Sequence, residues 1–309
     1  MDAEARDVVV IGGGAAGLSA ALVLGRARRR VVVIDAGSPR NAPAAHMHGY
    51  LSRDGMPPSE LLASGRAEVA GYGVEVRPGE VTSVAPGFEV TLQTGERLLA
   101  RRLLVATGAG DEIPDVPGVR ERWGRDVLHC PYCHGWEVRD RPLGLLAELP
   151  GSVQHALLIR QWSDDVVFFS HTSELAPEER RQLTARGIRI EDEAVNRLVI
   201  EDDRLAGVET SDGRVVPVAA VFVRPRIRPR DGGLLSLLGC AFDDAGFVRV
   251  DGMGRTSNPG VWAAGNVADP RAQVITAAGA GSAAAIAINA DLVDEDVALA
   301  LRGERATTG

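Results

Sequence analysis

The chain has 309 residues, of which 45% are hydrophobic and 25% charged, and its formal net charge is -8. This composition is typical of a soluble globular protein with core enough for two domains, and it excludes fibrous and disordered proteins. The basic residues are all arginine, which excludes lysine Schiff-base chemistry and, on an acidic chain, does not favour a nucleic-acid partner. Apolar runs of about four residues and an acidic start predict no membrane span, no secretory signal and a cytoplasmic location.

The N-terminal segment predicts a dinucleotide-binding unit. A buried strand, an Ala/Leu-rich helix and a second strand are expected in that order at residues 7–11, 18–25 and 31–35. The glycines of the pattern G-x-G-x-x-G, between the first strand and the helix, are Gly12, Gly14 and Gly17. Such glycines allow a tight turn and a close approach of backbone N–H groups to a pyrophosphate at the helix start. Asp35, which ends the second strand, is placed to bind ribose hydroxyls.

The middle of the chain contains a Cys-x-x-Cys pair, Cys130 and Cys133, flanked by His129 and His134. In a reducing cytosol a close pair of this kind is more often catalytic or metal-binding than structural. Zinc would need two further ligands at suitable spacing, and the third cysteine, Cys240, stands alone in a leucine-rich stretch. We therefore expect a redox-active disulfide with no metal, zinc being the alternative, and a buried, inert thiol at Cys240.

The C-terminal third decides which dinucleotide is bound. Residues 256–266 resemble the second FAD signature of flavoprotein disulfide reductases, although Asn266 stands where that signature has an acid. Residues 272–282 are rich in small side chains and are expected to begin a helix. Residues 103–108 match the segment of the same proteins in which a strand leads into the sequence Ala-Thr-Gly. With the cysteine pair, the sequence resembles the low-molecular-weight thioredoxin reductase family over nearly its full length.

The resemblance implies an α/β fold of two Rossmann-like dinucleotide-binding domains, the second inserted in the first. The FAD domain would comprise residues 1–114 plus 229–309, and the insert, which carries the cysteines, residues 115–228. The resemblance also implies a homodimer. The residues that the motifs and the resemblance assign to FAD are Gly12, Gly14, Ala15, Ala16, Gly17, Asp35, Ala36, Arg40, Asn41, His48, Ala106, Thr107, Gly108, Gly265, Asn266, Gln273 and Val274.

The insert departs from the reductases where NADPH should bind. A working domain should show its own G-x-G-x-x-G/A/S, but residues 143–156 place Ala147 and Leu149 at the first two glycine positions, with Glu148 between them. A β-carbon at each position obstructs close approach of a phosphate, and a carboxylate repels one. After the next strand, residues 170–174 lack the expected arginine cluster. NADPH is therefore a doubtful cofactor, although an atypical loop that still binds NADPH or NADH remains an alternative.

The cysteine motif favours oxidation of a dithiol. Thioredoxin reductases usually have an Asp after the second cysteine, whereas here His134 occupies that place, and histidine accepts a proton near neutral pH. The run from Cys133 to Glu137 resembles the FAD-dependent dithiol oxidases of gliotoxin and holomycin type, which close a disulfide in a small natural product. We therefore predict that a small-molecule dithiol reduces the Cys130–Cys133 disulfide, that Cys133 is the sulfur nearer the flavin, and that oxygen reoxidises FAD to give hydrogen peroxide.

Two other functions stay open. One is a thioredoxin-disulfide reductase fed by NADPH or ferredoxin, and the other is a flavin-dependent redox sensor without turnover. His129 is expected to assist His134, while His46 and His48 either contact flavin or substrate or have no role. Tyr132, Trp123 and Trp136 are interpreted as packing residues.

Overall fold

The computed structural model describes residues 6–307, and the chain divides into two compact units. The first unit comprises Met1–Arg40, Ser59–Gly110 and Arg228–Gly309, and the second comprises Asn41–Pro58 and Asp111–Ile227. The sequence-based division at residues 114 and 228 lies close to these boundaries, but it placed Asn41–Pro58 in the FAD domain. That segment belongs to the second unit, because its side chains contact residues there: His48 lies beside Glu137, and Pro43 lies against Gly124.

A mostly parallel sheet forms the centre of the first unit. Its strands are β1 (Arg6–Ile11), β2 (Val31–Asp35), β3 (Glu75–Pro78), β4 (Val81–Ala85), β5 (Glu89–Leu92), β6 (Arg97–Val105) and β17 (Val261–Ala263). The order is β3-β2-β1-β6-β5-β4, with β17 parallel to β6 and the β4–β5–β6 meander antiparallel. Residues 8–10 and 31–33 are buried throughout, as expected for strands covered on both faces.

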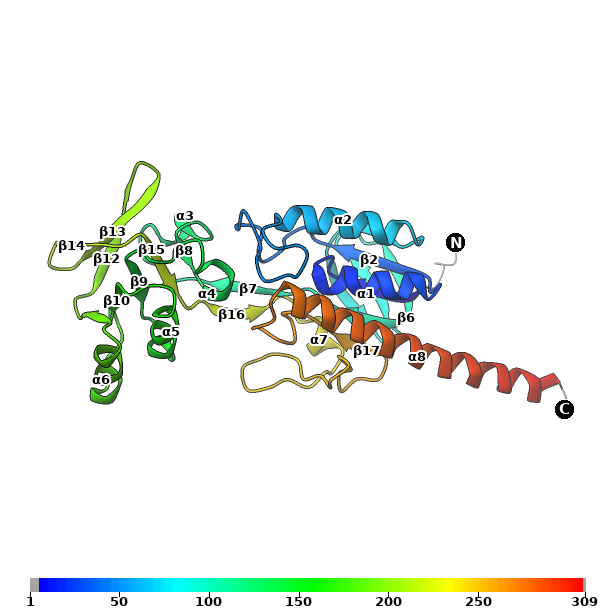
Figure 1. Cartoon of the computed structure of the whole chain (residues 1–309). Coiled ribbons are helices and arrows are strands. Elements are labelled where there is room, and N and C mark those ends of the chain that lie inside the picture. The colour runs from blue at the N-terminus through cyan, green and yellow to red at the C-terminus, as the bar shows by residue number, and fades with distance from the viewer. Residues whose placement is uncertain (1–5, 308–309) are drawn as a thin grey trace. The chain divides into compact units, whose positions relative to one another are not determined.

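Helices cover this sheet, and two of them touch through their backbones. They are α1 (Ala15–Arg26), α2 (Pro58–Ala70), α7 (Leu234–Leu237) and α8 (Val274–Thr307). In Figure 1, α1 and α8 run side by side across the sheet. A β-carbon on Gly281 of α8 would overlap the carbonyl oxygen of Ala16 in α1, so glycine is required for this approach.

Helix α8 is long and apolar enough, by length and composition, to cross a membrane over Val274–Gly303. The short unbroken apolar runs of the sequence do not predict this segment. The helix nevertheless packs as a core element: Ala284, Ala285, Ile288 and Leu292 are fully buried in the same cluster as residues of α1. A core helix of this kind satisfies the same criterion as a membrane span, so the feature is weak evidence for a membrane.

The second unit is built on a five-stranded parallel sheet in the order β11-β10-β9-β15-β8. Its strands are β8 (Val127–Leu128), β9 (Leu143–Leu146), β10 (Val166–Phe169), β11 (Arg189–Glu191) and β15 (Ala220–Val223). The helices are α3 (Val119–Arg122), α4 (Pro131–His134), α5 (Ser152–Ile159) and α6 (Pro177–Ala185). An antiparallel sheet adds β12 (Val195–Glu201), β13 (Arg204–Thr210) and β14 (Val215–Pro217).

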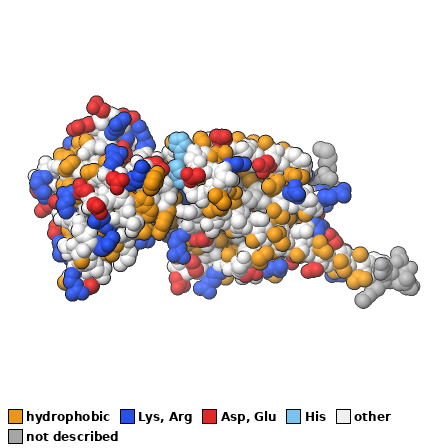
Figure 2. All heavy atoms as spheres, viewed as in Figure 1, with side chains coloured by type: hydrophobic (Ala, Val, Ile, Leu, Met, Phe, Trp, Pro, Cys, Tyr) orange, Lys and Arg blue, Asp and Glu red, His pale blue; other side chains and the backbone are white. Residues whose placement is uncertain are grey.

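The chain passes between the units through two short strands that pair with each other, β7 (Ala109–Glu112) and β16 (Arg226–Pro229). Both units therefore have the parallel sheet and flanking helices of a Rossmann-type domain, and the second is inserted between parts of the first. The predicted α/β fold class is confirmed. On the face shown in Figure 2, the described arginine and acidic side chains are interspersed rather than gathered in one basic surface.

Candidate active site

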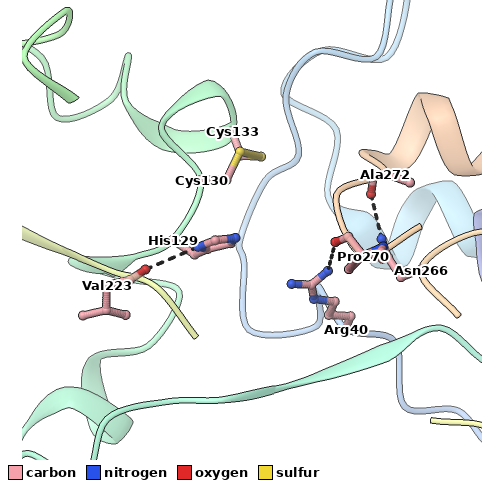
Figure 3. Close-up of a disulfide and its surroundings, with 8 residues drawn as sticks. All are labelled: Arg40, His129, Cys130, Cys133, Val223, Asn266, Pro270 and Ala272. Atoms are coloured by element: carbon pink, nitrogen blue, oxygen red, sulfur yellow. Dashed lines mark hydrogen bonds between the residues drawn. A yellow bond between two sulfur atoms is a disulfide. The ribbon is translucent and has the colours of Figure 1, made fainter. Parts of the chain in front are cut away.

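Cys130 and Cys133 form a disulfide, with their Cα atoms 5.2 Å apart. They lie just after strand β8, in the short helix α4, which Pro131 opens and where Cys130 occupies the N-cap position. Figure 3 shows the pair at the start of this helix. The carboxyl ends of parallel strands are the usual location of ligand sites in α/β folds. Both cysteines are half-buried, so the disulfide has the partial access that exchange with a small thiol requires. Zinc binding, the alternative, would first require this bond to be reduced.

His129 is oriented by the end of strand β15. Its Nδ1 atom lies 3.3 Å from the carbonyl oxygen of Val223, as Figure 3 shows. A carbonyl only accepts hydrogen bonds, so Nδ1 carries the hydrogen in this contact, and Nε2 keeps a lone pair in the neutral ring. Placed next to Cys130 in the chain, His129 can accept a proton through Nε2.

His134 ends helix α4 and is half-buried. Burial lowers its pKa below the ordinary value of histidine, Glu137 opposes this with its negative charge, and His48 adds to the lowering. The His134 ring is therefore neutral over a wider range of pH than an exposed histidine. This is the form that takes a proton from a thiol.

Two glycines of the motif, Gly12 before α1 and Gly17 within it, stand where a side chain would not fit. Gly12 has φ of 111°, and a β-carbon there would overlap the carbonyl oxygen of Ala106. A β-carbon on Gly17 would overlap the carbonyl oxygen of Gly12. By contrast, a β-carbon on Gly14 would have no described atom within 4 Å. The turn is thus tight on its inner side and open at Gly14, at the start of α1, where a pyrophosphate would approach.

The neighbouring polar groups also fit a dinucleotide. Asp35 lies at the end of β2, where its carboxylate accepts hydrogen bonds from Arg66 Nη2 at 2.8 Å and from the backbone N–H of Gly37 at 3.2 Å. The hydroxyl oxygen of Thr107, after β6, is buried and lacks a hydrogen-bond partner among the described residues. An orphaned hydroxyl beside an open turn is what a bound ligand would satisfy. The residues present therefore fit FAD.

Asn266 follows strand β17 and holds the loop that leads to α8. Its Nδ2 atom donates to the carbonyl oxygens of Asp269 and Ala272, each at 2.9 Å. In the same loop, Arg40 Nη1 donates to the carbonyl oxygen of Pro270 at 3.1 Å. Figure 3 shows the bond from Asn266 to Ala272 and the bond from Arg40 to Pro270. The Asn266 amide donates these two hydrogen bonds, whereas the acid of the related signature could not, because a carboxylate has no hydrogen to donate.

The structure therefore brings most of the residues predicted to contact FAD into the first unit. In that unit lie Gly12, Gly14, Ala15, Ala16, Gly17, Asp35, Ala36, Arg40, Ala106, Thr107, Gly108, Gly265, Asn266, Gln273 and Val274. Asn41 and His48 belong to the second unit, together with the four residues predicted to be catalytic. His48 contacts Asp54 and Glu137 there, each with a nitrogen-to-oxygen distance of 3.4 Å.

In the second unit, an arginine side chain lies against the loop before α5. Gly151 is the N-cap of α5 with φ of 85°, and a β-carbon there would overlap Arg224 Nη1, so this guanidinium lies directly against the helix start. Ser152 Oγ donates to the carbonyl oxygen of Leu149 at 2.6 Å, which closes the loop on itself. Ala147 is fully buried at the end of β9. The altered loop is visible in the sequence, but the contact made by Arg224 is not, because Arg224 follows strand β15, far along the chain.

Sequence reasoning also missed His155, a buried histidine of α5. It is 9% exposed, its ring lies 6.1 Å from the His129 ring and 6.1 Å from the Phe222 ring, and its Nδ1 atom has no partner among the described residues. Burial, reinforced by His129 and Arg224, lowers its pKa to about 3. A lone histidine on an apolar helix face gives no sequence signal that separates it from a packing residue.

His155 predicts an acid-sensitive second unit. The ordinary pKa of histidine, 6.5, applies to the unfolded chain, so between pH 6.5 and pH 3 the folded protein binds fewer protons at His155 than the unfolded chain does. The free energy of unfolding therefore falls as the pH drops through this range. Between pH 6.5 and pH 5 the expected loss is about 1.6 kcal/mol. His155→Phe keeps a ring but cannot take up a proton, so its loss between pH 6.5 and pH 5 should be smaller by that amount. Denaturant titrations at both pH values measure it, and an equal loss in both proteins would contradict it.

Two aromatic residues beside the disulfide are exposed. Tyr132 is 63% exposed and Trp136 is 65% exposed, so neither is a core residue. Each still makes a ring contact: Tyr132 lies edge to face with Trp162 at 5.5 Å between centroids, and the Arg139 guanidinium lies 3.8 Å from the centre of the Trp136 ring. Both lie on or just after α4, whose single turn is too short to bury both faces. Trp123, in contrast, packs against a buried cluster as expected.

Comparison with known proteins places the whole chain among relatives of one type. Residues 6–282 match the family model described as pyridine nucleotide-disulphide oxidoreductase. Thioredoxin reductase sirT of Leptosphaeria maculans is 32% identical over 318 residues, which cover 94% of this chain and 96% of that protein. Among solved structures, HlmI is 59% identical with a TM-score of 0.96, covering 99% of this chain and 98% of HlmI. An oxidoreductase from Agrobacterium tumefaciens is 36% identical with a TM-score of 0.88, covering 94% and 99%.

Proposed function

Because the chain belongs to the pyridine nucleotide-disulphide oxidoreductase family, as a thioredoxin reductase-like flavoprotein, we propose that it oxidises a small-molecule dithiol to a disulfide. The resemblance stated from the motifs is thereby confirmed, and the protein is a flavin-dependent thiol/disulfide oxidoreductase. The proposal concerns the direction of electron flow: from the substrate through Cys130 and Cys133 to FAD, and from there to oxygen.

The observation that supports this direction is the loop before α5 in the second unit, which lacks the glycine turn expected of a nucleotide site. The Arg224 guanidinium lies against the start of α5, the preceding loop is closed by Ser152, and Glu148 adds a negative charge. The Glu148 carboxylate repels a pyrophosphate, and the Arg224 side chain occupies space at the helix start that a pyrophosphate would need, while the positive charge of Arg224 by itself would attract one. If NADPH delivers no hydride there, the electrons come from a thiol substrate or from a protein donor such as ferredoxin. The His134 base next to Cys133 supports the same direction, because oxidation of a dithiol releases protons.

The chemistry then proceeds by two thiol exchanges. A substrate thiolate attacks Cys130, the sulfur–sulfur bond of the enzyme breaks, and Cys133 leaves as a thiolate. The second substrate thiol attacks the sulfur bonded to Cys130, which releases the oxidised product and leaves the enzyme as a dithiol. When bound, FAD supplies a two-electron acceptor that allows the enzyme disulfide to re-form and passes the electron pair to oxygen, giving hydrogen peroxide.

The two histidines accept the protons that these steps release. Neutral His134 takes the proton of the attacking thiol, so that the nucleophile is a thiolate. His129, with its Nδ1 held by the Val223 carbonyl, presents Nε2 as a second acceptor. Each turnover moves two electrons and two protons from the dithiol to oxygen. The bases therefore return to their starting state once the protons reach peroxide or solvent.

The experiment that tests this function uses the purified protein with bound FAD under anaerobic conditions. Dithiothreitol is expected to bleach the flavin absorbance, and admission of air should restore it with release of one peroxide per dithiol oxidised. NADPH is expected to leave the absorbance unchanged. Rapid bleaching by NADPH would instead favour the alternative, a thioredoxin-disulfide reductase, and a flavin that reacts with neither reagent at a useful rate would favour a redox sensor or a ferredoxin-fed reductase.

The physiological substrate, in this proposal, is a natural-product dithiol, as in antibiotic biosynthesis. A homodimer in the cytoplasm, with no membrane or nucleic-acid partner, remains our prediction from the sequence and from the family resemblance.

A further inference from the structure

Helix α2 carries an arginine, Arg66, on the face that it turns toward the rest of the first unit. Leu62 and Val69 are buried in the same cluster as residues of α1, and Arg66 lies between them in the helix. Residues at this spacing share one face of a helix. A β-carbon on Gly65 would lie 3.1 Å from Leu18 Cδ1 of α1, so the backbone beside Arg66 is packed closely against the neighbouring helix. The position from which Arg66 extends is therefore fixed by packing.

The guanidinium of Arg66 contacts the carboxylate of Asp35 at the end of β2. Its Nη2 atom donates to Asp35 Oδ2 at 2.8 Å, and the backbone N–H of Gly37 donates to Asp35 Oδ1 at 3.2 Å. On the side of the glycine turn, a β-carbon on Gly13 would come within 2.6 Å of Asp35 Cγ, so the backbone at Gly13 lies directly against this carboxylate. Three neighbours therefore fix the rotation of the Asp35 side chain.

These contacts leave part of the Asp35 carboxylate free to accept more hydrogen bonds. A carboxylate has about four lone-pair sites, shared equally by its oxygens, and Arg66 and Gly37 each use a site on a different oxygen. Each oxygen therefore keeps an unused site. The adenosine ribose of a dinucleotide offers a pair of adjacent hydroxyl donors, which matches this pair of sites. The contact with Arg66 thus orients Asp35 without using up its capacity to bind a ribose.

We propose that Arg66 is a positioning residue for FAD, because it holds Asp35 in the orientation that accepts the hydroxyls of the adenosine ribose. The role goes beyond the direction of electron flow, since it concerns how the first unit holds its cofactor and does not depend on the dithiol substrate. The Arg66 side chain is 40% exposed, and an ion pair with a partner this exposed contributes little to folding stability. The expected effect on FAD binding is therefore separable from any effect on the fold.

The test compares the dissociation constants of FAD and of an FAD analogue that lacks the 2′-hydroxyl of the adenosine ribose. Flavin fluorescence measures both constants in titrations of the apoprotein, and the rate of flavin release from the holoprotein gives a second measurement. The wild-type protein is expected to bind the analogue about tenfold more weakly than FAD, as for the loss of a hydrogen bond to a charged group. Arg66→Met keeps the aliphatic stem but removes every donor, so it should weaken FAD binding by about tenfold.

Three further variants separate this role from a general change in structure. In Asp35→Ala, adding Arg66→Met should cause no further loss of FAD affinity, because Arg66 acts through Asp35. Arg66→Lys keeps a charged donor and should recover part of the affinity that Arg66→Met loses. The matched control is Arg97→Met, which removes the guanidinium from an exposed pair with Glu89, at 3.2 Å in the same unit, and should leave both dissociation constants unchanged.

The analogue decides between positioning and mere structural support. If Arg66 orients Asp35 toward the ribose, the tenfold preference for FAD over the analogue should shrink in Arg66→Met, and the thermal unfolding of the apoprotein should change little. If Arg66→Met weakens FAD and the analogue by the same factor, leaves FAD binding unchanged, or lowers FAD affinity equally with and without Asp35, the positioning role is overturned. A wild-type protein that binds FAD and the analogue equally well would overturn it too. Failure of the protein to oxidise a dithiol would refute the proposed function and leave these binding results unaffected.

Discussion

Replacement of Cys133 by serine is expected to abolish dithiol oxidation, with a loss at least on the order of 10³-fold in turnover. The hydroxyl cannot form a disulfide with Cys130, so neither the exchange with substrate nor the return of electrons to the flavin can occur. Cys130→Ser should be equally inactive, because the disulfide needs both sulfur atoms and neither cysteine can form it alone. Oxygen consumption with dithiothreitol as substrate measures both variants, and flavin content shows that both still fold.

Cys240 supplies the matched control for this experiment. It is the free cysteine of the chain, buried in the first unit, where its thiol lies 3.5 Å from the Thr256 hydroxyl. Burial raises the pKa of this thiol, which makes it less reactive. Cys240→Ala should therefore cost some stability and leave turnover close to that of the wild type. Substantial oxidation by Cys133→Ser, or loss of oxidation in Cys240→Ala with FAD still bound, would show that the chemistry runs elsewhere.

Gly281→Ala is expected to destabilise the first unit by about 3 kcal/mol or more, because the added methyl group would overlap the backbone of α1 at Ala16. Backbone cannot rotate away as a side chain can, so the two helices would have to separate. Since α1 begins at the proposed pyrophosphate turn, this separation should also weaken FAD binding. Thermal unfolding and flavin content after purification measure the two effects.

Gly279 lies two residues earlier on the same helix and gives the opposite expectation. A β-carbon there would meet no described atom within 4 Å. Gly279→Ala should therefore stabilise α8 by about 0.5–1 kcal/mol, the usual gain when alanine replaces glycine in a helix. If both variants were equally tolerated, the close crossing of α1 and α8 would not be what requires glycine at position 281.

The first unit was largely predictable because its signals are local. The strand at residues 6–11, the glycines and the strand at residues 31–35 lie within a single stretch of chain, and period and turn chemistry describe them well. The Asn41–Pro58 segment was misplaced for the opposite reason. It has no regular structure, and its membership in the second unit is decided by contacts such as that of His48 with Glu137, which neither periodicity nor composition encodes.

The candidate active site likewise contains residues that the sequence predicts and residues that it does not. Cys130, Cys133 and their flanking histidines are adjacent in sequence, so their chemistry could be inferred together. Arg224 and His155 lie outside those motifs, and their roles depend on tertiary contacts. The Arg224 guanidinium lies against a helix start, and the Nδ1 atom of the buried His155 ring has no partner among the described residues. Residue type alone does not distinguish either from an ordinary arginine or histidine.

Asn266 limits how this chain can change. Both of its bonds to the loop before α8 use the amide as donor, so an aspartate there would set a carboxylate oxygen against the carbonyls of Asp269 and Ala272. Replacing Asn266 by the acid of the related signature would therefore remove both hydrogen bonds, and the loop would have to rearrange. A search pattern that demands the acid at this position will also pass over chains that have adopted the asparagine arrangement.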